Sequence, residues 1–474
     1  MSKGSKKIGR VLLSIWIVLF CLPIALLVIV RTPWVQQYIA KKASAYYTEK
    51  LGTKVEIGRV DIVFPIDISL YDVDIEDKHA NNLISAKEIT VAPEKLSLNF
   101  SKFGIRKVML READINIIKY LNEKDLNFQF LVDYFASTDT TKSRKSTMPN
   151  INLSSLILSN CNFKWQNQDK DTICDSNISF NNLTLSNINL FAQNVSVSDS
   201  VTELDLKHLA VEDCSGFTLR HLSSKITFLK DKIVADKLKL ITHNTNLNID
   251  LTFGFDSLSA FNKFEEKVLM DVNFRKSRVG FDDIARFAPA MNGMSSAVYL
   301  SGHAIGTVSD FEAEKMKLQI GEKTFMYFDL KTSGLPRTNS TFIDFDLKKS
   351  NIFISDIDNF KLPEGKTLNI QAILGDLSRT QLVANVKGYV NDFNANLLAK
   401  TNKGNVKAIV KSKGDFPNAT YNGKIDVDSF ALQQFVGNSV PIGAITSSVN
   451  FSGYGTSASN YRLDADAKIF SLYF

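Results

Sequence analysis

The sequence is poor in the residues that most often hold metals or carry out catalysis. It has four cysteines and five histidines in 474 residues, with no Cys-x-x-Cys pair and scattered histidines, which argues against a metal site. It also has no glycine-rich phosphate loop, nucleophile elbow or metal-ligand spacing. The adjacent carboxylates of Asp282 and Asp283 suit the first turn of a short helix. We therefore expect a protein that is not an enzyme and has no cofactor.

Beyond its first ten residues the chain also lacks a strong net charge. The formal charge of +6 comes from 56 Lys+Arg against 50 Asp+Glu, and four of the cations are Lys3, Lys6, Lys7 and Arg10. Subtracting these leaves 52 basic against 50 acidic residues. With no basic stripe and no recognisable binding motif, we expect no nucleic-acid partner.

A long uncharged run follows the basic tail of residues 1–10. Residues 11–30 carry no charge, and at about 1.5 Å per residue they are long enough to cross a hydrocarbon core of about 30 Å. A cleaved signal peptide is the competing interpretation, but its apolar region is shorter and ends in a small-x-small site, which is missing here. The run predicts a transmembrane signal anchor with a cytoplasmic N-terminus, and its anchor residues are Val11, Trp16, Phe20, Pro23 and Val30.

Residues 31–52 predict an amphipathic helix. Thr32 can cap it, Pro33 suits the first helical position, and Gly52 stands where helices often end. The helix either plugs the end of the sheet that follows or lies in the headgroup layer of a membrane, where tryptophan and tyrosine are favoured. The residues expected at the mouth of a groove are Trp34, Val35, Tyr38, Ile39, Tyr46 and Leu51.

From residue 53 onward the apolar period changes to two, which indicates strands with one wet face. We divide them into a first β region (53–135), a polar loop (136–150), a second β region (151–280) and a repeating region (281–474). A phase shift between Leu70 and Val73 suggests a bulge. The residues expected to line the apolar face are Ile66, Ile68, Leu70, Leu96, Leu98 and Phe100.

The region 281–474 contains a repeat of roughly 75 residues. "FDDIARFAP", "SDIDNFKLP" and "DSFALQQFVGNSVP" each predict a brief helical turn near a proline. Their phenylalanines Phe287, Phe360 and Phe435 are 73 and 75 residues apart. Such units rest on their neighbours, as in solenoids. The alternating pattern continues to the last residues, so either the protein continues or a partner covers an open edge.

Two questions about this β region stay open in the sequence. Folding "CNFKWQNQDKDTIC" about its polar centre places Cys161 opposite Cys174, so they form a disulfide or remain two half-buried thiols. The apolar face needs a cover, since few helices follow Leu51. A β-sandwich or closed barrel covers itself, whereas a curled open sheet would hold acyl chains on its inner face.

Several stretches of the sequence resemble a known family. "TPWVQQYIAKKASAYYTEKLGTKVEIGRVDI" and "LYDVDIEDKHANNLISAKEITV" are similar to the N-terminus of AsmA-like proteins, specifically the TamB (translocation and assembly module) family. "FDDIARFAP" and the strands after it resemble the repeating body of that family in its Bacteroidetes-like branch. The characteristic C-terminal domain of TamB is absent, so the chain resembles an N-terminal portion or a shorter relative.

The resemblance implies a long β-groove with a hydrophobic interior, anchored in the inner membrane of a diderm bacterium with its body in the periplasm. It implies a carrier of phospholipid toward the outer membrane, acting with an Omp85-type or TamA-type outer-membrane partner. The alternative is a scaffold for protein secretion or outer-membrane protein assembly, whose exposed strand edges pair with client strands.

Overall fold

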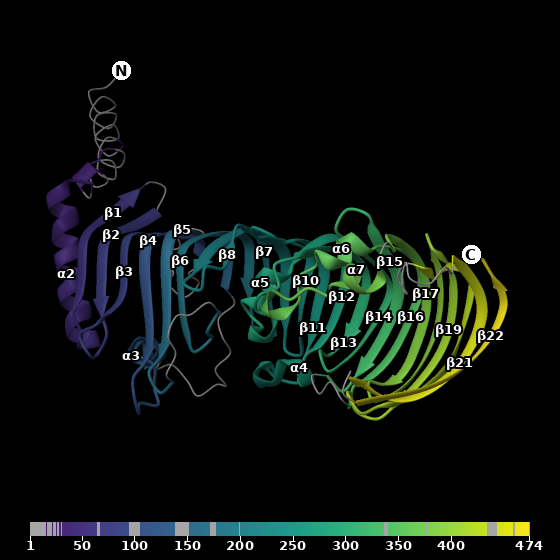
Figure 1. The fold of residues 1–474 in the computed structure, drawn as a ribbon. Helices are drawn as coiled ribbons and strands as arrows, with labels where there is room; N and C mark the ends of the chain where they lie inside the picture. The colour runs from purple at the N-terminus through teal and green to yellow at the C-terminus, as the bar shows by residue number, and fades with distance from the viewer. Residues whose placement is uncertain are drawn as a thin grey trace, which may run out of the picture. The chain divides into compact units, whose positions relative to one another are not determined.

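The computed structural model is mostly β, and it consists of two compact units, Met1–Thr218 and Leu219–Phe474 (Figure 1). The description covers residues 16, 21, 25, 28–29, 31–63, 67–93, 105–137, 151–170, 177–198, 200–335, 340–375, 377–433, 443–457 and 460–473. Within each unit, neighbouring strands pair in a sheet that helices accompany.

In the first unit, a helix is followed by strands that pair in the order β1-β2-β3-β4-β5-β6-β7. The short strand β8 (Thr218–Leu219) crosses the boundary between the units. The elements are α2 (Pro33–Leu51), β1 (Val55–Val63), β2 (Asp67–Glu76), β3 (Asn82–Pro93), β4 (Ile105–Lys119), α3 (Gln129–Ser137), β5 (Ile151–Asn167), β6 (Asn182–Val197) and β7 (Val201–Asp213).

One pair of neighbouring strands in this unit is parallel, whereas the others are antiparallel. β4 and β5 are parallel, with Leu110 opposite Leu158 and Ile115 opposite Phe163. A parallel pair requires a crossover, because the chain must return to the end at which it began. The crossover includes α3, which occupies the first two positions of the predicted loop 136–150. The rest of that loop lies outside the described residues.

In the second unit, the strands follow one another as an antiparallel meander from β9 to β22. The strands are β9 (His221–Leu229), β10 (Lys232–Ile241), β11 (Asn246–Gly254), β12 (Leu269–Gly280), β13 (Ala297–Gly306), β14 (Asp310–Ile320), β15 (Thr324–Ser333), β16 (Phe342–Phe353), β17 (Arg379–Tyr389), β18 (Asp392–Thr401), β19 (Gly404–Lys413), β20 (Thr420–Ala431), β21 (Ala444–Ser457) and β22 (Asn460–Leu472).

Short helices interrupt the meander at strand ends. They are η1 (Leu258–Lys263), α4 (Phe264–Lys267), α5 (Phe281–Ala285), η2 (Pro289–Met291), α6 (Ile354–Asp358), η4 (Pro363–Gly365) and α7 (Ile370–Leu374). The first two predicted helical turns are therefore present, as α5 with η2 and α6 with η4. Most of the third, including Phe435, lies outside the described residues.

Neither sheet closes on itself among the described strands. β1 does not pair with β7, and β9 does not pair with β22. The described strands of each unit form no second sheet that packs over the first. The sandwich and the closed barrel are thus excluded for the described part of each unit, and the open sheet is confirmed.

The expected irregularity between Leu70 and Val73 is present in a form that the sequence did not predict. Asp72 has a positive φ of 51°, which shifts the alternation of side chains in β2. The register with β1 nevertheless runs on unbroken through Arg59–Tyr71 and Ile57–Val73. No residue is inserted in β2 alone, so the feature is a kink shared by paired strands rather than a bulge.

Of the two open interpretations, the disulfide between Cys161 and Cys174 is excluded, because Cys161 is a free, buried thiol. β5 ends at Asn167, near the expected turn, but its antiparallel partner β6 begins only at Asn182, so Cys161 lies opposite Ile188. Cys214 is disulfide-bonded. Cys174 lies outside the described residues.

Among the described residues, no helix has both the length and the apolar composition to span a membrane. Of the anchor residues, Trp16 is described and is 63% exposed. Val11, Phe20, Pro23 and Val30 lie outside the described residues, so the anchor remains a prediction.

Candidate functional site: an uncharged face across the strands

The most extensive feature of the second unit is a row of side chains that crosses every strand from β9 to β22 without a polar or charged residue. Each member is the direct cross-strand partner of the next. The row consists of Ile226, Ala235, Leu251, Val272, Ala304, Ala313, Leu330, Phe345, Val386, Ala395, Val410, Gly423, Phe451 and Ala465. We call this row and its flanking positions on the same side the apolar face.

The first unit has a matching row across its seven strands, β1 to β7. It consists of Val60, Leu70, Ile89, Leu110, Leu158, Leu190 and Leu209. Leu70 is thus a member of the row, and Ile68 lies beside it, opposite Ile62 and Val91. Both stand on the apolar face. Ile66, Leu96, Leu98 and Phe100 lie outside the described residues.

In the second unit, the burial of small side chains on the apolar face indicates that this face is the concave one. The strands bend strongly along their length (Figure 1), so side chains on the inside of the bend crowd together. Ala384, Ala395 and Ala408 are only 4%, 7% and 7% exposed, although the described strands form no second sheet above them. The result is a trough whose floor is apolar.

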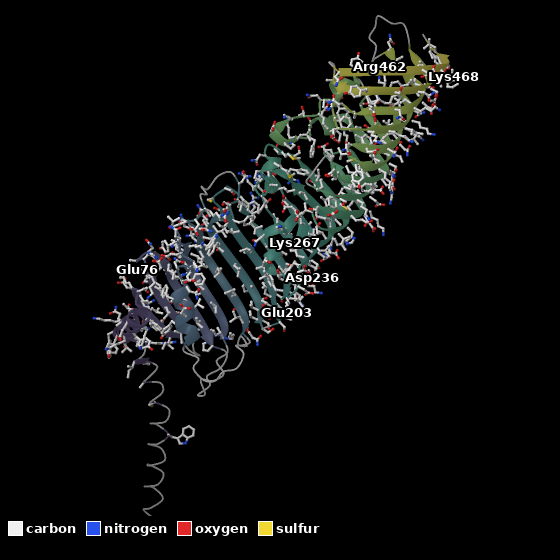
Figure 2. The ribbon with its side chains drawn as sticks, turned by 90° about the horizontal axis from the view of Figure 1, so that it is seen from below. Glu76, Glu203, Asp236, Lys267, Arg462 and Lys468 are labelled. Atoms are coloured by element: carbon white, nitrogen blue, oxygen red, sulfur yellow. The ribbon has the colours of Figure 1, made fainter. Side chains whose placement is uncertain are left out.

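The opposite face of the same strands carries the charges, because successive side chains of a strand point to opposite sides. Lys387 lies 2.6 Å from Asp344, and Lys331 lies 3.7 Å from Glu312, each across two neighbouring strands. Figure 2 shows charged side chains, among them Asp236 and Arg462, projecting from the ribbon. We call this side the polar face.

Aromatic rings cover glycines on the floor of the trough. A Cβ at Gly423 would lie 2.2 Å from the Ile409 carbonyl oxygen and 2.8 Å from the Phe451 ring. A Cβ at Gly453 would lie 2.4 Å from the Tyr421 ring. Both positions therefore require glycine, since a side chain would displace the ring and push the strands apart.

Two bulges in the second unit are fixed by the same arrangement of three residues, which we call the bulge clamp. In the first, Lys237 has a φ of 51° and its backbone N–H donates to Asp250 at 2.8 Å, while Arg275 binds the same carboxylate. In the second, Lys315 has a φ of 51° and its N–H donates to Asp329 at 2.7 Å. Lys348 is the cation there.

The clamps hold their carboxylates in the charged form. The bond from Arg275 and the Lys237 N–H lower the pKa of Asp250, and Lys348 and the Lys315 N–H lower that of Asp329. The bulge residues are 78 positions apart and the carboxylates 79 apart, close to the predicted repeat. Because bulges increase local twist and bend strands, the clamps help to set the curvature of the trough.

Short helices close part of the trough at the ends of its strands. Phe261 and Phe264 pack edge-on against Phe253, with ring centroids 6.2 and 5.7 Å apart, so η1 and α4 cover this part of the apolar face. At other strand ends, Phe281 of α5 packs on Phe360 at 5.5 Å. Phe287 is 51% exposed, whereas Phe360 packs against Phe281. The repeat phenylalanines Phe287 and Phe360 therefore lie in different environments.

Helix α2 covers the edge of the sheet rather than its face. Ser44 Oγ accepts the Ile57 N–H at 2.9 Å, Thr48 Oγ1 accepts the Val55 N–H at 3.0 Å, and Gln36 donates to Asp61 at 2.8 Å. The bonds from Ser44 and Thr48 satisfy backbone groups that an edge strand leaves unpaired, and the bond from Gln36 joins two side chains. The helix does pack on the sheet, which is one of the two interpretations of its pattern.

The side of α2 that meets the sheet is not the one that we predicted. Its buried residues are Gln36, Ala40 and Leu51, because an edge presents N–H and C=O groups that call for small and polar neighbours. Of the predicted set, Leu51 is buried, Val35 and Ile39 are half-buried, and Trp34, Tyr38 and Tyr46 are 69%, 59% and 52% exposed.

A buried carboxylate fixes the turn between β2 and β3. Asp77 is 2% exposed and accepts the Tyr120 hydroxyl at 2.6 Å, Asn127 Nδ2 at 3.1 Å and the N–H groups of His79 and Asn81 at 2.9 Å each. Burial opposes ionisation of Asp77, but these bonds together lower its pKa. Burial and the bond to Asp77 raise the pKa of Tyr120 to about 12.

No group of histidine, cysteine and carboxylate side chains in the described part of the chain could hold a metal ion. The sequence pattern missed the glycine–ring pairs and the bulge clamps, which depend on cross-strand register. The one signal available was the repeat spacing of about 75 residues.

Comparisons with known proteins identify no relative. No family model matches the chain, and neither a curated protein nor a solved structure matches it.

Proposed function

We propose that this protein is a lipid conduit, in which acyl chains lie along the apolar face and headgroups remain in water at the open side of the trough. The observation that carries the proposal is the uncharged row across β9–β22, together with its counterpart across β1–β7. Each buried methylene of an acyl chain gains about 0.8 kcal/mol. No covalent step is required.

A track of this kind suits movement as well as binding. Neighbouring positions on the row differ in size but not in polarity, so an acyl chain that shifts by one strand exchanges one apolar contact for another. A charge on the track would instead create a barrier, because burying an unpaired charge against hydrocarbon costs several kcal/mol. Transfer of phospholipid from the inner membrane toward an Omp85-type outer-membrane partner is the route that we propose, with residues 11–30 as the anchor.

A pair of adjacent residues gives the sharpest test. Leu330 belongs to the apolar row, and Lys331, the next residue of β15, points to the polar face. With a photo-crosslinking amino acid at one position or the other in the full chain, we expect phospholipid adducts from position 330 and few from 331. A folded protein with equal or no lipid adducts at both positions would overturn the proposal.

A charge substitution tests transport itself. Val386→Asp places a carboxylate in the middle of the row, whereas Asn394→Asp places one on the polar face between its cross-strand partners Lys387 and Lys411. We expect Val386→Asp to abolish outer-membrane lipid supply in cells that depend on this protein, and Asn394→Asp to leave it intact. If crosslinks recover unfolded β-barrel precursors and no lipid, the scaffold function replaces the conduit.

A further inference from the structure

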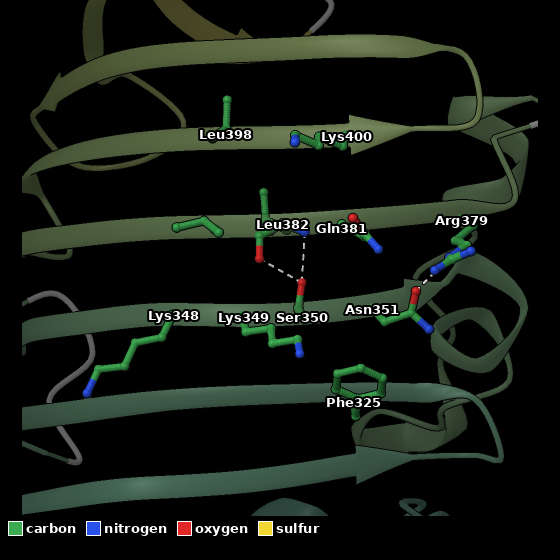
Figure 3. A pocket seen from close by; sticks show the side chains of 11 residues that line it. Phe325, Lys348, Lys349, Ser350, Asn351, Arg379, Gln381, Leu382, Leu398 and Lys400 are labelled. Atoms are coloured by element: carbon green, nitrogen blue, oxygen red, sulfur yellow. Dashed lines mark hydrogen bonds between the residues drawn. The ribbon is translucent and has the colours of Figure 1, made fainter.

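The polar face of the second unit contains two adjoining hollows over β15–β19 that the lipid track does not use. The first has a volume of about 450 Å³, and the second about 400 Å³. Val383 and Leu398 line both, so the hollows share a wall. Figure 3 shows the first hollow, with Lys349, Arg379 and Lys400 on three different strands around it.

The first hollow is cationic. Lys348, Lys349, Arg379 and Lys400 line it, and no carboxylate is among its lining residues. Lys348 is engaged by Asp329 of the bulge clamp, which leaves three cations in excess. Arg379 is held in place, because its Nε donates to Asn351 Oδ1 at 2.6 Å and its guanidinium lies 5.8 Å from the Phe353 ring centroid.

The second hollow is lined largely by apolar side chains, with Asp346 and Lys407 also among its lining residues. Val383, Leu398 and Ile409 are 45%, 45% and 42% exposed, although they stand on the charged side of the sheet. Cross-strand partners place Val383 beside Leu398, and the hollow continues onto β19 at Ile409. A cationic end and an apolar end thus lie side by side within one depression.

We propose that the paired hollows bind one anionic phospholipid. Its phosphate contacts Lys349, Arg379 and Lys400, and the first methylenes of an acyl chain cover Val383, Leu398 and Ile409. Hollows of a few hundred Å³ are the size of small-ligand sites, whereas a stable protein partner needs about 800 Å² on each side. This site does not depend on the conduit, because it lies on the other face of the sheet.

The test uses the full chain and a water-soluble probe, dihexanoyl phosphatidylglycerol with a diazirine on one acyl chain. Adducts are mapped to peptides by mass spectrometry. We expect adducts on the polar face of β17–β19. Lys349→Gln with Lys400→Gln should lower this labelling about fivefold or more, since each exposed charge contact contributes modestly to binding.

The controls separate the alternatives. Lys411→Gln with Lys413→Gln removes two exposed cations of β19 outside the hollows and should change nothing. The zwitterionic choline analogue should label this face at least fivefold less. Unchanged labelling in the Lys349/Lys400 variant overturns the site, and complete competition by equimolar inorganic phosphate overturns the lipid assignment. Adducts on the apolar face, for example at Leu330, belong to the conduit and should not respond to the lysine changes.

Discussion

The uncharged rows of the two units consist of different kinds of side chain. In the first unit the row is made of aliphatic side chains of similar size, for example Ile89, Leu110 and Leu158. In the second it mixes small and large residues, for example Ala313 beside Leu330 and Gly423 beside Phe451. The difference shows that apolarity is the common requirement, while size varies with the local geometry of the sheet.

The mixed row belongs to the strongly bent sheet. Side chains on a concave surface converge, so a large ring can be accommodated only where its neighbour is small. Gly453 under the Tyr421 ring and Gly423 beside Phe451 satisfy this condition. The first unit instead places its small residues, Ala86, Ala113 and Cys161, in a separate buried cluster next to the row.

Breaking the size pattern of the second unit should have the largest effect. Gly423→Val forces a side chain against the Ile409 carbonyl and the Phe451 ring, and we expect a loss of about 3–5 kcal/mol. Hydrogen–deuterium exchange of β19–β21 in the full chain measures it locally. Ala465→Val on the exposed strand β22 also introduces valine into the same row and should change exchange little. Equal effects would show that crowding does not set the pattern.

In the first unit, the largest effect is expected at the buried carboxylate. Asp77→Asn replaces an acceptor of four hydrogen bonds with an amide that can accept only some of them, and we expect a loss of about 2–4 kcal/mol. Tyr120→Phe removes one donor and should cost less, about 1–2 kcal/mol. Denaturant unfolding of the full chain checks the order, and the reverse order would contradict our account of the network.

The same carboxylate predicts a pH dependence. The pKa of folded Asp77 is lowered, so its stabilising contribution is present above the unfolded value of about 3.9 and is lost as the pH falls through the folded pKa. At the alkaline end, Tyr120 has a pKa of about 12, so its contribution is present below about pH 10 and is lost as the pH rises toward 12. In the Asp77→Asn variant, the part of the stability that is lost at acid pH should no longer depend on pH.

The two bulge clamps can be compared directly. Asp329→Asn or Asp250→Asn removes a charged acceptor from a bulge N–H and a partner from a cation, and we expect each to cost about 1–2 kcal/mol. We expect faster hydrogen–deuterium exchange at the Lys315 or Lys237 amide. The loss of stability should be similar for the two variants. A large loss at one site alone would show that the repeated geometry is not a repeated function.

The smallest effect is expected at the covered edge. Ser44→Ala removes the acceptor of the Ile57 N–H, and we expect a loss of about 1 kcal/mol. Thr48→Ser keeps a hydroxyl for the bonds to Val55 and serves as the control. Exchange at the Ile57 amide measures both variants, and an unchanged rate in Ser44→Ala would indicate that α2 covers β1 by packing alone.

Much of this architecture can be predicted from periodicity. The period of two from residue 53 gave the strands and one apolar face, and the pattern of residues 31–52 gave a helix within two residues of each bound. The helical turns at Phe281 and Ile354 follow from their spacing. These features depend on neighbours in the sequence, where side-chain alternation and capping residues are directly visible.

What the sequence did not reveal depends on neighbours in space. The parallel pair β4–β5 requires knowledge of where the crossover returns, and the cross-strand partner of Cys161 depends on where β6 begins. The bulge clamps depend on which carboxylate faces which amide across the sheet. The side of α2 was misassigned because amphipathicity predicts packing on an apolar face, whereas β1 presents an edge of polar backbone groups.

The buried thiol of Cys161 offers a way to measure local opening of the first unit. Its thiol is 2% exposed among Ala86 and Ala113, in a chain that also contains the disulfide-bonded Cys214. An alkylating reagent can reach this sulfur only when the neighbouring strands separate, so the rate of alkylation in fast-closing conditions equals the intrinsic rate multiplied by the opening equilibrium. A sulfur atom that takes no part in cross-linking thus reports how often the crossover pair β4–β5 comes apart.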